Sequence, residues 1–271
     1  MAETIAYLGP QGTFTEEAAF AWSRDKREKC YLPLASSGEV ITSILRGRAD
    51  KGILPLENSR EGSVGQTLDI LIDEEVTIAG EIILSIQHYL FILPGADFKK
   101  IKEIHSHPQA LAQCRPFLVA HFPGAKEIPH LSTGAAAASV VAGKNNRAAV
   151  LASKRSGDIY GLVPLRAVLP EEACNQTRFI VLGRETPPPS GDDKTSFLFS
   201  VGKGPGLLYR VLAVFAASGI DLTKIESRPA KRVLGEYIFF LDCRGHLQDA
   251  VISSAQEEVR KKVPFLKVLG S

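Results

Sequence analysis

Two kinds of hydrophobic spacing alternate through the first two thirds of the chain. Short apolar runs of the kind that forms buried strands alternate with stretches whose apolar residues recur every three or four positions, as on one helix face. The runs predicted as strands are 5–8, 52–54, 82–86, 89–93, 148–152 and 178–182. Helices are predicted from about Glu16, through 68–72, around 110–118 and from Thr133. This alternation is typical of an α/β fold, and we expect a parallel sheet.

A polar, proline-rich segment ends this pattern. Residues 186–193 read Thr-Pro-Pro-Pro-Ser-Gly-Asp-Asp, and three consecutive prolines exclude a helix and remove the N–H donors that a strand needs. We therefore predict two domains, with boundaries at residues 1–185 and 194–271.

The segment after the linker follows a different order of elements. Strand 196–201, helix 207–217, strands 221–227 and 237–242, helix 249–261 and strand 265–269 give the βαββαβ order of ferredoxin-like domains. Helices on one face of such a sheet leave the other face or an edge to be covered, often by a second copy. We therefore expect a homodimer or homotetramer.

Composition narrows the possible partners. The chain has 271 residues, 45% of them hydrophobic, and its 32 basic and 30 acidic residues leave a formal net charge of +2. Because the basic residues form no stripe and no apolar run approaches ~20 residues, we expect neither nucleic-acid binding nor a membrane span. The four cysteines are far apart, which argues against a zinc site and favours a reducing, cytoplasmic location. No metal or other cofactor is indicated.

Five short motifs, in order, resemble those of the prephenate dehydratases. They are Gly9-Pro10-Gln11-Gly12-Thr13-Phe14-Thr15, Pro55-Leu56-Glu57-Asn58-Ser59, Ser106-His107-Pro108-Gln109 with Gln113-Cys114, Ser132-Thr133-Gly134, and Asn175-Gln176-Thr177-Arg178-Phe179. The segments Gly204-Pro205-Gly206-Leu207-Leu208 and Glu226-Ser227-Arg228-Pro229 resemble the regulatory ACT domain of these enzymes. No chorismate mutase segment precedes the first motif, so the chain resembles the monofunctional form.

The resemblance implies a fold and a reaction. The fold would be a two-lobed α/β catalytic domain, similar to a type II periplasmic binding protein, followed by a ferredoxin-like ACT domain. The reaction would convert prephenate to phenylpyruvate with loss of carbon dioxide and water, in phenylalanine biosynthesis. The protein must hold a dianion and protonate a departing hydroxide, which requires no cofactor.

The family assigns the acid to the threonine of its Thr-Arg-Phe motif, here Thr177. A hydroxyl needs help to give up its proton, so we expect Arg178 to stabilise the charge and to clamp a substrate carboxylate. On pattern alone, Asn175 and Thr177 equally suit a turn before a buried strand, with Arg178 in a surface ion pair.

The remaining cleft residues follow strand ends and helix starts. Glu57, Asn58 and Ser59 follow an apolar strand, where ligands bind in open α/β sheets, with Glu57 expected to orient Asn58 or Arg178. Thr13 lies in a glycine loop whose free N–H groups suit a carboxylate, and Ser132 and Thr133 open a helix; both segments equally suit helix capping. The alternative for Glu57–Ser59 is a solvated turn. Ser106 and Gln113 lie two helical turns apart, and we expect both to face the same cleft.

In the ACT half, the resemblance implies a phenylalanine site at an interface of two ACT domains. Gly204, Pro205 and Gly206 form a strand-to-helix loop suited to an amino-acid carboxylate, Leu207 and Leu208 offer an apolar wall, and Glu226, Ser227, Arg228 and Pro229 complete the site. Bound phenylalanine would inhibit by misaligning or closing the catalytic cleft, and a catalytic half cut at Asp193 would stay active without responding to it.

Two other functions remain open at this level. Arogenate dehydratases share these motifs and act on the transaminated substrate. A sensor of amino acids or carboxylates without catalytic activity would also fit, because binding-protein lobes and ACT domains both hold small ligands.

Overall fold

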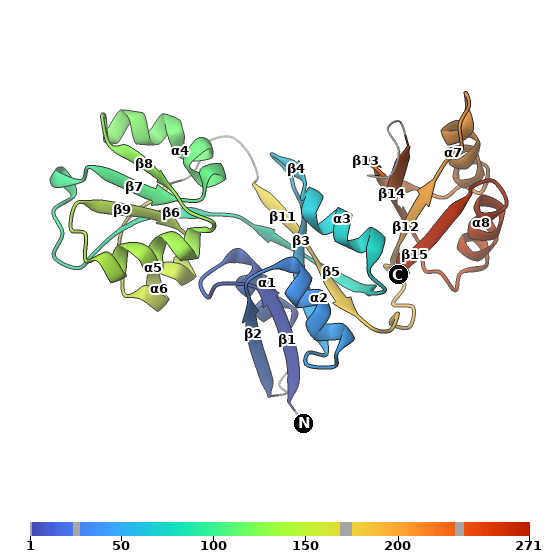
Figure 1. The fold of residues 1–271 in the computed structure, drawn as a ribbon, viewed down its shortest axis with the longest axis horizontal. Helices are drawn as coiled ribbons and strands as arrows, with labels where there is room; N and C mark the ends of the chain where they lie inside the picture. Colours follow the sequence, from blue (N-terminus) through green and yellow to red (C-terminus); the bar gives the residue numbers. More distant parts are fainter. Residues whose placement is uncertain (1, 24–27, 169–174, 231–235) are drawn as a thin grey trace.

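Three bodies lie in a row in the computed structural model, which describes residues 2–23, 28–168, 175–230 and 236–271 (Figure 1). The first lobe lies in the middle, the second lobe flanks it on one side, and the C-terminal domain flanks it on the other. None of the helices within these ranges is long and apolar enough to cross a membrane.

The first lobe is a sheet in the order β2-β1-β3-β11-β5, with β4 paired to β3. Its elements are β1 (Glu3–Leu8), α1 (Phe14–Trp22), β2 (Lys29–Leu34), α2 (Ser37–Leu45), β3 (Lys51–Asn58), β4 (Gly62–Ser63), α3 (Gly65–Asp73), β5 (Thr77–Ser85) and β11 (Gln176–Gly183). Both faces are apolar: Ile5 and Ile53 pack with α1, whereas Ala6 and Leu54 pack with α2 and α3. Burial on both faces explains why these strands are continuous apolar runs.

The second lobe is a sheet in the order β10-β6-β9-β7-β8. Its elements are β6 (His88–Ile92), the 3-10 turn η1 (Phe98–Lys100), β7 (Glu103–Ser106), α4 (Pro108–His121), β8 (Lys126–Pro129), α5 (Thr133–Gly143), β9 (Ala148–Ala152), α6 (Lys154–Tyr160) and β10 (Val163–Val168). The chain enters this lobe after β5 and returns to the first sheet as β11, which confirms two α/β lobes.

The prediction of a parallel sheet is confirmed only in part, because the sheets of both lobes are mixed. In the first sheet β1 runs parallel to β2 and β3, but β11 is antiparallel to β3 and β5. In the second, β7 is parallel to β8 and β9, but β6 is antiparallel to β9 and β10. The reversed strands are β6 and β11, the first strand that the chain forms after each crossing between the lobes, so helix–strand alternation alone does not reveal them.

The C-terminal domain has the expected βαββαβ order. Its elements are β12 (Lys194–Ser200), α7 (Leu207–Ala217), β13 (Leu222–Pro229), β14 (Tyr237–Arg244), α8 (Ala250–Arg260) and β15 (Phe265–Gly270). The strands form an antiparallel sheet in the order β13-β14-β12-β15. Phe197, Phe199 and Leu241 pack with the two helices on one face.

The other face of this sheet packs on the first lobe of the same chain. Leu198, Phe240 and Leu269 belong to the same buried cluster as Ile180 and Leu182 of β11. Gly270 lies so close to β5 that a Cβ there would lie 2.2 Å from the carbonyl oxygen of Ile78.

The shared core changes two expectations. The sheet face that we expected a second copy to cover is covered within the chain, so the argument for a second copy now rests on the edge strands β13 and β15. Removing the chain from Asp193 onward would expose apolar surface on the first lobe, and we no longer expect an intact, active remainder.

Candidate active site

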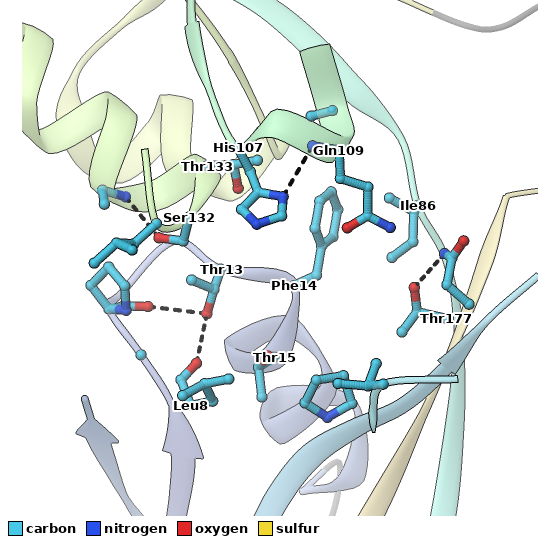
Figure 2. A pocket seen from close by; sticks show the side chains of 18 of the residues that line it. Leu8, Thr13, Phe14, Thr15, Ile86, His107, Gln109, Ser132, Thr133 and Thr177 are labelled. Atoms are coloured by element: carbon cyan, nitrogen blue, oxygen red, sulfur yellow. Dashed lines mark hydrogen bonds between the residues drawn. The ribbon is translucent and has the colours of Figure 1, made fainter. Parts of the chain in front are cut away.

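A cavity of about 820 Å³ lies between the two lobes (Figure 2). Both lobes line it, the first mainly through α1, β2, β3 and β11, and the second mainly through α4 and α5. The polar side chains in its lining are Thr13, Thr15, Asn58, Gln66, His88, His107, Gln109, Gln113, Ser132, Thr133, Asn175 and Thr177. Lys, Arg, Asp and Glu are absent from the described lining.

Three of the helices that begin at this cavity have a side-chain cap. Thr13 caps α1 by accepting a hydrogen bond from the Glu16 N–H at 3.3 Å, and Ser132 caps α5 by accepting from the Ala135 N–H at 3.0 Å. His107 Nδ1 accepts from the Gln109 N–H at 3.3 Å and caps α4 (Figure 2). Because the N-terminal end of a helix carries partial positive charge, the cavity favours an anionic ligand even without a lysine or arginine.

The Thr177 hydroxyl is held by the side chain of Asn58. Asn58 Nδ2 donates to Thr177 Oγ1 at 2.9 Å and to Asn175 Oδ1 at 2.8 Å. Asn58 Oδ1 accepts from the Arg60 N–H at 3.0 Å, which fixes the orientation of the amide. Since Thr177 Oγ1 accepts from Asn58, its own proton is available to a ligand in the cavity.

The same network crosses to the second lobe. Asn175 Nδ2 donates to Gln113 Oε1 at 3.0 Å, and Gln113 Nε2 donates to Glu61 Oε1 at 3.2 Å. Gln113 lies on α4, as expected from a helix beginning at Pro108. The network therefore links the position of α4 to the hydroxyl of Thr177.

The glycine loop at residues 9–13 is held by hydrogen bonds to other parts of the protein. The Gly9 N–H donates to Leu34 O at 2.8 Å and the Gly12 N–H to Glu16 Oε2 at 2.9 Å, so these two amides are not free for a carboxylate as predicted. Gly12 has φ +83°, and its carbonyl accepts from Ser156 Oγ at 2.6 Å. The two glycine motifs also meet, because a Cβ on Gly134 would lie 2.8 Å from Gln11 O.

Arg178 lies on the opposite face of β11 from Thr177, because successive strand residues point to opposite faces. Its Nε donates to Glu81 Oε2 at 2.7 Å, and its Nη1 to Asp242 Oδ2 of β14 at 2.5 Å. Asp242 is fully buried and the Arg178 side chain is 7% exposed. The expectation of a carboxylate clamp in the cleft is therefore incorrect for this structure.

Glu57 shares the Arg178 side of the sheet. The two residues are paired across β3 and β11, with Glu57 Oε1 3.9 Å from Arg178 Nη1. Glu57 also forms an ion pair with Lys224 of β13. Glu57 thus faces the C-terminal domain, while its neighbour Asn58 lines the cavity.

Two further predicted residues lie outside the cavity lining. Ser106 is fully buried at the end of β7 and donates to Leu151 O at 2.6 Å. Ser59 Oγ accepts from the Gln176 N–H at 3.0 Å and joins the end of β3 to the start of β11. Ser59 thus supports the two strands that carry Asn58 and Thr177, whereas Ser106 supports β7, which ends just before His107.

The segments proposed to bind phenylalanine occupy two places in the C-terminal domain. Gly204, Pro205 and Gly206 lie in the loop before α7, whose N-cap Gly206 provides no side-chain hydrogen bond, and Leu207 and Leu208 begin the helix. On β13, Ser227 and Pro229 are exposed.

Glu226 and Arg228 of the same strand face the first lobe. Glu226 accepts a hydrogen bond from Ser63, and Arg228 Nη2 lies 3.0 Å from Asp69 Oδ1. Two of the four residues in the proposed β13 motif, Glu226 and Arg228, therefore contact the first lobe of the same chain.

Sequence reasoning missed several lining residues. Asn175, Gln109 and Phe179 lie within quoted motifs but were given no role in the cleft, and His88 and Gln66 lie outside the motifs altogether. A histidine or glutamine beside a strand or helix end has no distinctive spacing, so only the fold reveals that they meet. Cys174, one of the four cysteines, lies outside the described residues.

Comparison with known families gives two matches in chain order. A model described as prephenate dehydratase matches residues 5–187, and one described as ACT domain matches residues 198–261.

Whole proteins resemble the chain over nearly its full length. A bifunctional chorismate mutase/prephenate dehydratase of Stutzerimonas stutzeri is 39% identical, covering 98% of this chain and 72% of the relative. The solved structure of prephenate dehydratase from Arthrobacter aurescens in complex with L-Phe has a TM-score of 0.90 at 32% identity, covering 98% of this chain and 89% of that one. GqqA, described as a novel type of quorum quenching acylase, has a TM-score of 0.87 at 28% identity, covering 99% and 97%.

Replacing Asp242 with Asn should destabilise the protein by about 3–5 kcal/mol, because Arg178 would remain buried without its principal partner. Urea unfolding at pH 7 measures this change. Asp221→Asn is the matched control, since its pair with Arg244 is exposed and should contribute less than about 1 kcal/mol. Equal effects of the two substitutions would contradict the importance of the buried pair.

The stability supplied by Glu81 should depend on pH. Burial alone would raise the pKa of Glu81, but Arg178 and Lys194 outweigh burial and lower it below its usual 4.5. A lowered folded pKa means that the contribution is present above pH 4.5 and is lost as the pH falls through the folded pKa. The stability difference between wild type and Glu81→Gln, measured by urea unfolding across pH, should be constant near neutrality and shrink in acid. A difference that grows in acid would contradict this sign.

Proposed function

Because the chain belongs to the prephenate dehydratase family, we propose that it is a carbon–oxygen lyase that converts prephenate to phenylpyruvate, carbon dioxide and water. In this reaction the bond to the ring carboxylate breaks and its electrons enter the ring. The ring C–O bond breaks at the same time, and the departing hydroxide takes up a proton. The protein must therefore supply a proton donor and a site for a dianion.

The hydrogen bond from Asn58 to Thr177 is the observation that carries this proposal. It leaves the Thr177 proton free to pass to the departing hydroxide. As the proton leaves, the Asn58 N–H already points at the oxygen that becomes negative, so no group has to reorient. Thr177 is the general acid, Asn58 stabilises its conjugate base, and Asn175 and Gln113 hold Asn58 in place.

The charge around the cavity supports a dianionic substrate. We assign the carboxylates to the first turns of α1, α4 and α5, with Thr13, Ser132 and Thr133 at the helix starts. Arogenate carries an ammonium group in place of the keto oxygen of prephenate, and a site for it would be expected to include a carboxylate. Asp and Glu are absent from the described lining, which favours prephenate.

We further propose that phenylalanine inhibits the enzyme through the ACT domain. Gly204–Leu208 and Glu226–Pro229 form the effector site, completed by a second copy across the exposed edge strand β13 in a homodimer or homotetramer. The catalytic domain spans residues 1–185 and the ACT domain 194–271, and we place the enzyme in the cytoplasm.

The ion pairs between β13, β14 and the catalytic sheet offer a route for this inhibition. Lys224 pairs with Glu57, and Asp242 pairs with Arg178. Glu57 and Arg178 precede and follow the Asn58–Thr177 pair on β3 and β11. A shift of the ACT sheet would therefore move the two strands that position the acid. We assign Glu57 and Arg178 as positioning residues, and Ser59 and Ser106 as supports of the cleft.

Replacing Thr177 with Ala should lower kcat for phenylpyruvate formation at least ~100-fold, with a smaller change in KM, because general acid catalysis typically contributes that much. Absorbance of phenylpyruvate in base measures the rate. Ser43→Ala is the matched control, since Ser43 is fully buried in the same lobe and donates to Val40 O at 2.7 Å, and neither residue lines the cavity. A Thr177→Ala enzyme with near wild-type kcat would exclude Thr177 as the acid.

A wild type that releases no phenylpyruvate would exclude the proposed reaction. Release of phenylalanine from arogenate would then identify an arogenate dehydratase, and ligand binding without turnover of either substrate would identify a sensor.

Substituting Lys224 with Met should raise the phenylalanine concentration required for half-inhibition at least ~5-fold, within the range of ordinary allosteric coupling. The substitution breaks the link between β13 and Glu57. Lys261→Met removes a lysine from an exposed ion pair at the C-terminal end of α8 and should leave the inhibition curve unchanged. Inhibition curves that coincide for Lys224→Met and wild type would show that the coupling takes another route.

A further inference from the structure

His88 is a buried histidine in the cavity lining to which the proposed reaction gives no role. It begins β6, immediately after the chain crosses from the first lobe to the second, and is 6% exposed. Its ring meets Phe14 of α1 edge-on, with 5.5 Å between the ring centroids and 78° between their planes. The ring therefore lies where the two lobes meet at the cavity.

A ring nitrogen of His88 is unpaired. Among the described residues, Nδ1 of His88 is the one fully buried side-chain nitrogen or oxygen without a hydrogen-bond partner. Buried polar groups are nearly always paired, because an unpaired one loses its bonds to water without replacement. A phenylalanine or leucine would fill the same space without that cost, so the polar ring requires an explanation beyond packing.

The environment keeps the imidazole neutral. Burial, followed by the nearby His107, lowers the pKa of His88 to about 4, so at neutral pH the ring carries one N–H donor and one acceptor. A neutral N–H donor suits a carboxylate, hydroxyl or keto oxygen. Prephenate carries all three groups.

We propose that His88 is a substrate-binding residue whose ring turns when prephenate enters the cavity, which brings its unpaired nitrogen to the ligand, and then donates a hydrogen bond to an oxygen of prephenate. The assignment rests on the proposed function and adds a direct contact from the second lobe. The crossing segment supports it, because the Ile86 N–H donates to Asn175 O at 2.7 Å. His88 is thereby tied to the strand start that carries Thr177.

The test compares His88→Phe and His88→Asn with a matched histidine in the same lobe. His105 is 9% exposed and outside the cavity lining, and both its ring nitrogens are paired, with His130 Nε2 at 2.9 Å and Glu103 Oε2 at 3.1 Å. Thermal unfolding and steady-state kinetics with prephenate are measured for the wild type, both His88 variants and His105→Phe.

The two Phe substitutions should have opposite effects. His88→Phe should raise Tm by about 2 °C or more, since an unsatisfied polar group is removed. It should also lower kcat/KM about 10- to 100-fold, chiefly through KM, because a bond to a charged ligand is lost. His88→Asn keeps a donor and should restore part of the loss. His105→Phe should lower Tm and leave the kinetics of the folded enzyme unchanged.

A wild-type KM in His88→Phe would overturn the assignment, whichever way Tm moves. Should His88→Phe fail to fold, His88→Leu, which also lacks a hydrogen-bond donor, takes its place, and a wild-type KM in His88→Leu would overturn the assignment equally. Should the wild type not turn prephenate over, the proposed reaction fails separately. His88 is then tested independently by thermal unfolding with phenylpyruvate. The ligand should raise the Tm of the wild type but not that of His88→Phe.

Discussion

The alternation of side chains along β3 and β11 is the constraint on which the site depends. These strands form the centre of the first sheet, with one surface toward the cavity and the other toward the C-terminal domain. Asn58 and Thr177 take the cavity side, so Glu57 and Arg178 necessarily take the other. A single strand pair therefore presents the proton donor on one face and buried ion pairs on the other. Neither set of residues can shift without affecting its neighbours.

The same arrangement separates two ways of handling charge. The guanidinium of Arg178 neutralises Asp242 and Glu81 in a buried interface, where an unpaired carboxylate would be costly. The cavity instead relies on partial charges at the starts of α1, α4 and α5, which are fixed in place by capping side chains. Such dipoles need not be desolvated or reoriented when a dianion arrives, which suits a site that must release a product with one carboxylate fewer.

Much of the fold was predictable because its signals are local. The strand at 148–152 and the helix at 207–217 appear with the predicted bounds, since one is a continuous apolar run and the other an apolar helix bounded by glycine. Weaker elements were missed: β8 is short and polar, α2 follows a strand with exposed residues, and α6 has few apolar positions. Their formation depends on the lobe that surrounds them.

The site was predictable in its motifs but not in its geometry. Resemblance placed Thr177, Asn58, Gln113, Thr13, Ser132 and Thr133 at the cleft, and all six line the cavity. The assignment of Arg178 failed because adjacency in sequence was taken for adjacency in space, although alternate strand residues face apart. The sequence around His88 does not indicate a site residue. His88 stands out only because its buried Nδ1 has no hydrogen-bond partner, which is visible only in the folded structure.

The roles of Thr177 and Arg178 would be decided by a crystal structure with a non-eliminating analogue of prephenate that keeps both carboxylates and the ring hydroxyl. We expect the ring hydroxyl within ~2.6–3.2 Å of Thr177 Oγ1, the carboxylates at the helix starts, and Arg178 still paired with Asp242. An analogue whose carboxylate binds Arg178, with its hydroxyl directed away from Thr177, would contradict these roles.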